Sequence, residues 1–120
     1  MNTHEYFLDS PYQILGCYKD TVDRAILQLE GTDPILDGLY QYRENAVQKC
    51  YKAALSLGYT VFAVQDSGQC FSSDTAKDTY KKYGESTECA DDGEGGPLAN
   101  AVYEIAQGKL QYMCVCLRAF

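Results

Sequence analysis

Six cysteines in a chain of 120 residues constrain the fold more than any other feature of this sequence. An even number of cysteines in a small chain favours a disulfide framework and an oxidising compartment, because cytosolic disulfides are rare. A chain of this length forms one domain with a modest core. The sequence therefore predicts a single, bridged, extracellular domain, and a reduced cytosolic protein is the alternative.

The charge of the chain bears on its partners. Ten Lys and Arg against 17 Asp and Glu give a net charge of -7. Such a chain repels nucleic-acid phosphates and anionic lipid heads, and no apolar run approaches the length that crosses a bilayer. We expect no nucleic-acid partner and no membrane insertion. The N-terminus lacks the basic and apolar regions of a secretory signal, which favours a domain taken from a larger secreted or surface protein.

The clearest secondary-structure signals lie between residues 43 and 72. A helix is predicted over 43–57, because apolar residues recur there with helical spacing, at Val47, Cys50, Tyr51, Ala54 and Leu55. Gly58 supplies the left-handed stop of that helix. Residues 59–65 are apolar on both faces, which is typical of a central strand. A turn at 66–68 then returns the chain into a partner strand at 69–72.

The remaining segments complete an α+β fold. Strands are predicted at 12–18 and 99–105, with a short edge segment at 24–26 and long loops at 30–38 and 85–96. Asp74 is expected to cap a second, shorter helix, whose apolar stripe is Ala76, Tyr80 and Tyr83. Residues 110–117 supply a possible further strand. The fold class is thus one main helix and a short second helix packed on an antiparallel sheet of four or five strands, stabilised by disulfides.

Two disulfides are predicted from the placement of the cysteines. Cys50 lies on the apolar face of the main helix, and Cys70 lies in the hairpin partner of the strand that follows it, so packing brings the two within bridging range. We expect Cys50 to pair with Cys70 and Cys17 to pair with Cys89. Cys114 and Cys116 point the same way on a strand, so a bridge to another chain and self-association are expected of them.

Several motifs carry a resemblance to a known family. They are Leu-Gly-Cys-Tyr-Lys-Asp at 15–20, Asp-Arg-Ala-Ile at 23–26, Phe-Ala-Val-Gln at 62–65 and Gly-Gln-Cys-Phe at 68–71. Their order and spacing resemble WSC modules over residues 12–105, which leaves 1–11 as an N-terminal arm and 106–120 as an extension of uncertain status. The resemblance implies an extracellular, disulfide-bonded module that holds polysaccharide or glycoprotein.

The later part of the chain is closer to WSC-like and PAN/apple-like modules of large extracellular proteins. The residues that carry this likeness are 79–84, Cys89, 93–96 and 99–103. PAN/apple-like modules imply protein–protein adhesion or assembly. WSC modules usually carry more cysteines than the four inside the matching region, so their disulfide map does not transfer as a whole.

Catalysis is not expected. His4 is the only histidine and lies in the predicted arm, away from any candidate nucleophile. Asp91, Asp92 and Glu94 would serve glycoside hydrolysis only if two of their carboxyls faced each other across a cleft. The same three residues place hard oxygens on a flexible loop, with a carbonyl of Asn100 nearby, which suits calcium. The alternative is a plain acidic surface loop, and no cofactor is required.

Sugar binding is the leading functional hypothesis. Eleven tyrosines offer flat apolar faces and hydroxyls, and Tyr18, Tyr40, Tyr42 and Tyr103 are the ones without a predicted place in the core. The expected lectin-like surface lies near the 66–70 turn and the acidic loop, with Tyr18, Gln65, Asp66, Gln69, Asn100 and Tyr103 as ligand contacts. Arg24 is expected to pair with Asp20 or Asp66. The rival hypothesis is a protein–protein adhesion or assembly module.

Overall fold

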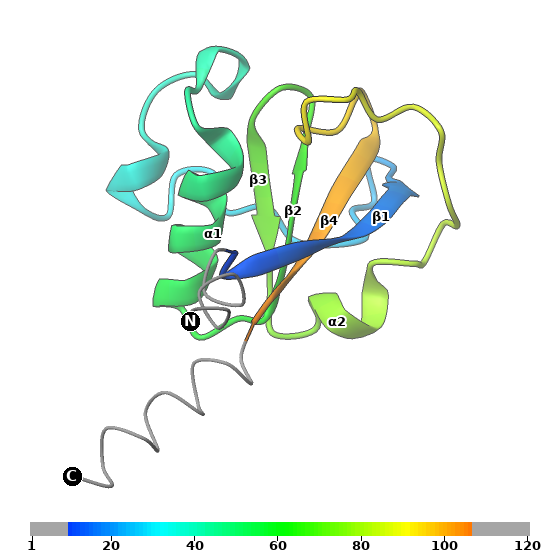
Figure 1. The fold of residues 1–120 in the computed structure, drawn as a ribbon, viewed down its shortest axis with the longest axis horizontal. Coiled ribbons are helices and arrows are strands. Elements are labelled where there is room, and N and C mark those ends of the chain that lie inside the picture. Colours follow the sequence, from blue (N-terminus) through cyan, green and yellow to red (C-terminus); the bar gives the residue numbers. More distant parts are fainter. Residues whose placement is uncertain (1–9, 107–120) are drawn as a thin grey trace, which may run out of the picture.

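The computed structural model describes residues 10–106, which form a four-stranded antiparallel sheet with helical segments beside it (Figure 1). The strand order is β1-β4-β2-β3, and the elements are β1 (Tyr12–Lys19), η2 (Pro34–Leu36), η3 (Tyr40–Tyr42), α1 (Ala46–Ser56), β2 (Val61–Gln65), β3 (Gln69–Ser72), α2 (Ala76–Thr79) and β4 (Ala99–Ile105). The η segments are single turns of 3-10 helix. The predicted fold class is confirmed. The possible strand at 110–117 and the cysteines at 114 and 116 lie outside the described residues.

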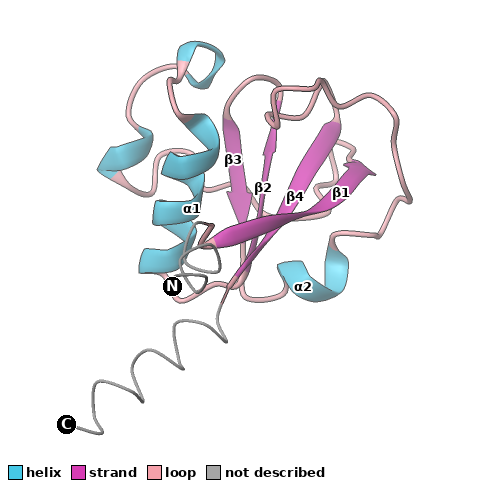
Figure 2. Ribbon diagram, viewed as in Figure 1, coloured by secondary structure: helices cyan, strands magenta, loops and turns pink. Residues whose placement is uncertain are grey.

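The sheet is covered on both faces, as Figure 2 shows for the helical segments. On one face α1 packs through Cys50, Ala53 and Ala54 against Phe62, Val64 and Tyr103. On the other face the loop after β1 packs through Ile26, and α2 packs through Ala76, against Ala63, Phe71 and Val102. All five residues of β2 are therefore buried, which confirms the prediction of a central strand. In the described part of the chain, no helix is long and apolar enough to cross a membrane.

The main helix begins three residues later than predicted. Arg43 has extended backbone angles, and Asn45 takes a left-handed conformation directly before Ala46. The side chain of Arg43 instead forms an ion pair with Glu30 in the interior. At the other end the prediction holds, since Gly58 has a positive φ of 78° and donates to the carbonyl of Leu55.

Two local predictions are wrong. Asp74 does not cap α2: Thr75 precedes the helix, and the helix ends at Thr79, before Tyr80 and Tyr83. The hydroxyl of Thr79 donates to the carbonyl of Ala25, so tertiary contacts rather than a cap fix this short turn. Residues 24–26 form no strand, and the edge of β3 is met by a single bridge between Gln28 and Phe71.

The two disulfides join the pairs predicted from the sequence. Cys50 of α1 is bonded to Cys70 of β3, with Cα atoms 5.3 Å apart, and both residues are buried. Cys17 of β1 is bonded to Cys89 in the long loop before β4, with Cα atoms 6.1 Å apart. One bridge thus ties the helix to the sheet, and the other ties the loop to the edge strand.

Candidate functional site

Three loops meet at one end of the sheet, which we call the loop end. They are residues 37–45, the β2–β3 turn at 66–68 and the acidic loop at 91–96. The phenol of Tyr40 lies 3.4 Å from a carboxylate oxygen of Asp66, and the Asp66 amide donates to the Gly96 carbonyl at 3.2 Å. Figure 1 shows the turn between β2 and β3 beside the yellow loop at this end. The loop end therefore unites the turn and the acidic loop on which the sequence placed a sugar site.

Two of the polar residues predicted to contact a ligand, Gln65 and Asn100, are buried in a hydrogen-bond network. Gln65 is 2% exposed and Asn100 is fully buried. The Gln65 amide donates to Asp20 Oδ2 at 2.7 Å and to Asn100 Oδ1 at 2.8 Å. Asp20 also accepts from the amide of Ala25 and from the guanidinium of Arg24, which confirms the expected Arg24–Asp20 pair. This network is enclosed, so Gln65 and Asn100 are removed from the candidate surface.

Three further predicted contacts are also buried. Gln69 donates to the side-chain oxygen of Gln28, and Tyr18 packs edge-on against Tyr80. Tyr103 stacks on Phe62, and its hydroxyl donates to the Gly93 carbonyl at 2.7 Å. Burial, and then the neighbouring Tyr12 and acidic loop, raise the pKa of Tyr103. Of the six predicted sugar contacts, Asp66 is the one that keeps a partly exposed side chain at the loop end.

The acidic loop is organised by its own hydrogen bonds. The Glu94 amide donates to Asp92 Oδ1 at 2.9 Å, while Asp91 and Asp92 are exposed. Partial burial of Glu94, together with the charge of Asp92, raises the pKa of the Glu94 carboxyl. Within residues 10–106, no three acidic, histidine or cysteine side chains are grouped closely enough to hold a metal ion. Calcium binding by Asp91, Asp92 and Glu94 stays a prediction.

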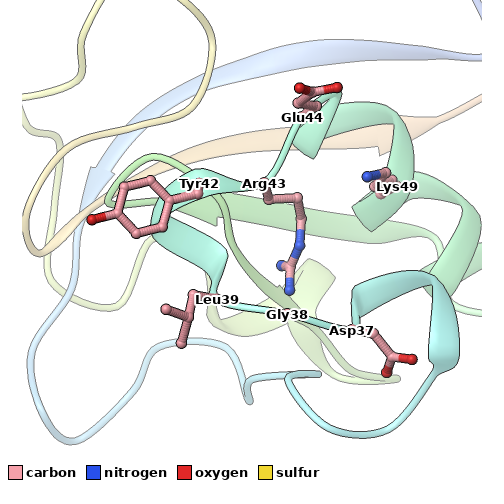
Figure 3. A pocket seen from close by; sticks show the side chains of 7 residues that line it. All are labelled: Asp37, Gly38, Leu39, Tyr42, Arg43, Glu44 and Lys49. Atoms are coloured by element: carbon pink, nitrogen blue, oxygen red, sulfur yellow. The ribbon is translucent and has the colours of Figure 1, made fainter.

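A hollow of about 370 Å³ lies on the first of the three loops (Figure 3). Tyr42 and Leu39 are highly exposed on it, at 82% and 70%. Figure 3 shows Tyr42 and Leu39 on one side of Arg43, Lys49 and Asp37 on the other side, and Glu44 above it. An exposed aromatic ring and charged groups around the same hollow provide an apolar face and hydrogen-bonding partners. The hollow is therefore a candidate ligand site.

Arg43 fixes the loop that carries this hollow. Its side chain is 2% exposed and forms a bidentate pair with Glu30, at 2.7 and 2.9 Å. The same guanidinium donates to the carbonyls of Leu36 and Gly68, and Glu30 also accepts from the amide of Cys70. The pair therefore links the 30–43 segment to the β2–β3 hairpin and restrains the residues between.

Sequence reasoning found part of this site. Tyr40 and Tyr42 stood out as tyrosines without a place in the core, but the hollow beside Tyr42 was not predicted. Because the helix was predicted to begin at residue 43, the change of chain direction at Arg43 was not predicted. The buried pair of Arg43 with Glu30 joins residues 13 positions apart, so it leaves no periodic signal in the sequence. A single arginine next to a turn-rich, acidic segment is compatible with such a buried pair.

The β2–β3 turn makes a testable contribution to the loop end. A Cβ added at Gly68 would lie 2.3 Å from the backbone carbonyl of Tyr40. We expect Gly68→Ala to lower the free energy of unfolding by about 1–3 kcal/mol, because the turn and η3 must separate. Ser67 has a positive φ of 78°, so Ser67→Gly is expected to gain up to about 1 kcal/mol. Urea unfolding of both variants measures the contrast, and equal effects of one sign would contradict it.

The chain is similar to a known protein family. The family model described as the WSC domain matches residues 14–97, well over half of the chain. The match includes the 37–45 loop, both disulfides and the β2–β3 turn. None of the curated proteins compared with the chain matches it. The resemblance to WSC modules is thereby confirmed, whereas the PAN/apple-like resemblance stays a prediction.

Proposed function

The chain belongs to the WSC domain family, and on that premise we propose that it is an extracellular, lectin-like module that binds carbohydrate without catalysis. WSC domains are disulfide-bonded modules of carbohydrate-binding type, and the family is one of binding modules. The family match is the observation that carries the proposal. The proposal also has finer parts, which are argued from the loop end. They are lectin-like recognition, secretion or display on a surface protein, and a glycan or glycoprotein as partner.

The loop end has physical properties that suit sugar binding. Carbohydrate rings present apolar C–H faces and hydroxyls together, so they are held by aromatic rings with polar groups beside them. Tyr42 provides such a ring, and Asp66 lies near the same end with its carboxylate partly exposed. The two disulfides and the Arg43–Glu30 pair hold the underlying loops, which reduces the entropy lost on binding.

Protein–protein adhesion or assembly is the second candidate function. Its support is the exposure of Leu39 and Tyr42 at the two ends of the η3 turn, because tyrosine is enriched at protein interfaces. Self-association through Cys114 or Cys116 belongs to this candidate, and both cysteines lie outside the described residues. In such a module the exposed side chains would meet another protein rather than a sugar ring.

A glycan array separates the two candidates. We expect the oxidised protein to bind a defined group of saccharides with affinities of about 10⁻⁶ to 10⁻³ M, and to lose binding after reduction and denaturation. Running the array with calcium and with a chelator tests Asp91, Asp92 and Glu94, because loss with chelator would assign them to a metal site. Tight self-association without any glycan bound would contradict the proposal and support assembly.

A further inference from the structure

The hollow beside Tyr42 is an open depression of the surface, and the fold holds the backbone around it. Its volume of about 370 Å³ lies at the small end of the range for ligand sites, roughly 300–1,000 Å³. Its walls come from two elements, the 37–44 loop and α1, which contributes Lys49. The Asp37 and Arg43 amides donate to the carbonyls of Pro34 and Tyr40, so single 3-10 turns hold the backbone on both sides of Leu39. A ring-sized unit is the ligand that this space accommodates.

The aromatic wall is available without rearrangement. Tyr42 is 82% exposed, and no hydrogen bond or ring contact engages its side chain within residues 10–106. Tyrosine loses little conformational entropy when it packs, because it has two side-chain torsions. The neighbouring Leu39 adds apolar area to the same side of the hollow. A sugar ring laid on this wall would cover apolar surface that water now covers.

The charges of the hollow decide which class of sugar it accepts. Asp37 and Glu44 are exposed carboxylates among the lining residues, and Lys49 supplies an ammonium group on the same side as Asp37. Arg43 supplies no free positive charge, because its guanidinium is paired in bidentate fashion with Glu30. With Arg43 neutralised by Glu30, the summed charge of the side chains that line the hollow is thus negative, in a chain whose net charge is -7. Uronate, sialate or sulfate groups would be repelled, whereas sugar hydroxyls can donate to both carboxylates.

We propose that this hollow is the saccharide site of the module and that it selects uncharged, hydroxyl-rich sugars over acidic or sulfated ones. The inference rests on the proposed function and adds to it the location and the ligand class. Tyr42 provides the stacking face, and the carboxylates of Asp37 and Glu44 accept hydrogen bonds from sugar hydroxyls. Arg43 and Glu30 are positioning residues, which fix the loop and do not touch the sugar.

The test uses soluble β-glucan, dextran and mannan, each in native and in sulfated form, with the oxidised full chain. We expect wild type to bind at least one native polysaccharide more tightly than its sulfated form, with little change between low and high NaCl. Tyr42→Ala should weaken that binding by about tenfold or more. Asp37→Asn with Glu44→Gln should weaken it as well, because two strong acceptors become weaker amides.

Matched controls keep the outcomes separate. Val22→Ala alters an exposed apolar residue, and Asp74→Asn alters an exposed carboxylate, both outside the hollow, so neither should change binding. Unchanged affinity of Tyr42→Ala for a native polysaccharide would overturn the location and leave the proposed function standing. Tighter, salt-sensitive binding of the sulfated forms would overturn the ligand class. If wild type bound no saccharide here or on the array, the proposed function itself would fail.

Discussion

Replacing Arg43 with leucine is expected to lower the free energy of unfolding by about 3–5 kcal/mol. The substitution leaves the Glu30 carboxylate in a largely enclosed position without its bidentate partner. It also removes the donors to the carbonyls of Leu36 and Gly68. Such a loss is a large fraction of the stability of a small domain, which is about 5–15 kcal/mol. The urea midpoint, followed by circular dichroism, should fall by on the order of 2 M.

Two further variants make this result specific to the geometry of the pair. Arg43→Lys keeps the charge, but a single ammonium cannot replace the planar fork, so we expect an intermediate loss. Lys82→Ala removes the cation of an exposed pair with Asp23, which solvent screens, so it should leave the urea midpoint nearly unchanged. If Arg43→Leu and Lys82→Ala had the same small effect, the Arg43–Glu30 pair would not be the element that holds the loop.

Removing the bridge between Cys17 and Cys89 should have an effect of similar size. The two cysteines are 72 residues apart, so the bridge closes a long loop in the unfolded chain. Chain entropy for a loop of this length corresponds to about 4 kcal/mol of stabilisation. The double variant Cys17→Ala/Cys89→Ala is therefore expected to unfold about 4 kcal/mol more easily in urea, with the transition read by circular dichroism.

The control for the bridge is a change in the same loop that leaves the bridge intact. Thr87→Ala alters an exposed residue two positions from Cys89, and its effect should stay within about 0.5 kcal/mol. Backbone bonds also hold this loop, since the Ser86 amide donates to the Cys17 carbonyl. Should the double variant lose less than about 1 kcal/mol, those backbone bonds rather than the disulfide would be holding the loop to β1.

Local sequence patterns predicted most of the fold because its elements carry local signals. The apolar spacing around Cys50 and the stop at Gly58 identified α1, and the continuous apolar run before Gln65 identified β2. The start of α1 was misplaced because Arg43 is held by Glu30, a tertiary contact that periodicity does not encode. Asp74 was misassigned for the same reason, since the position of α2 depends on the contact between Thr79 and Ala25.

The candidate site was predicted less well than the fold. Gln65 and Asn100 lie in strands whose neighbours are apolar, and strand geometry gives no sign of which polar side chain has an internal partner. Their network with Asp20 joins residues 35 and 45 positions apart. Tyr42 was identified as lacking a core role, but the hollow beside it arises from a turn at Arg43 that sequence alone did not show.

Saccharide binding at the hollow can be located by an NMR titration of the oxidised, isotope-labelled chain with the uncharged oligosaccharide that binds best on the array. We expect the amide signals of residues 37–49 to shift in a saturable way while those of α2 stay fixed. Saturable shifts confined to α2 and its neighbours, or no shift with any uncharged sugar, would contradict it.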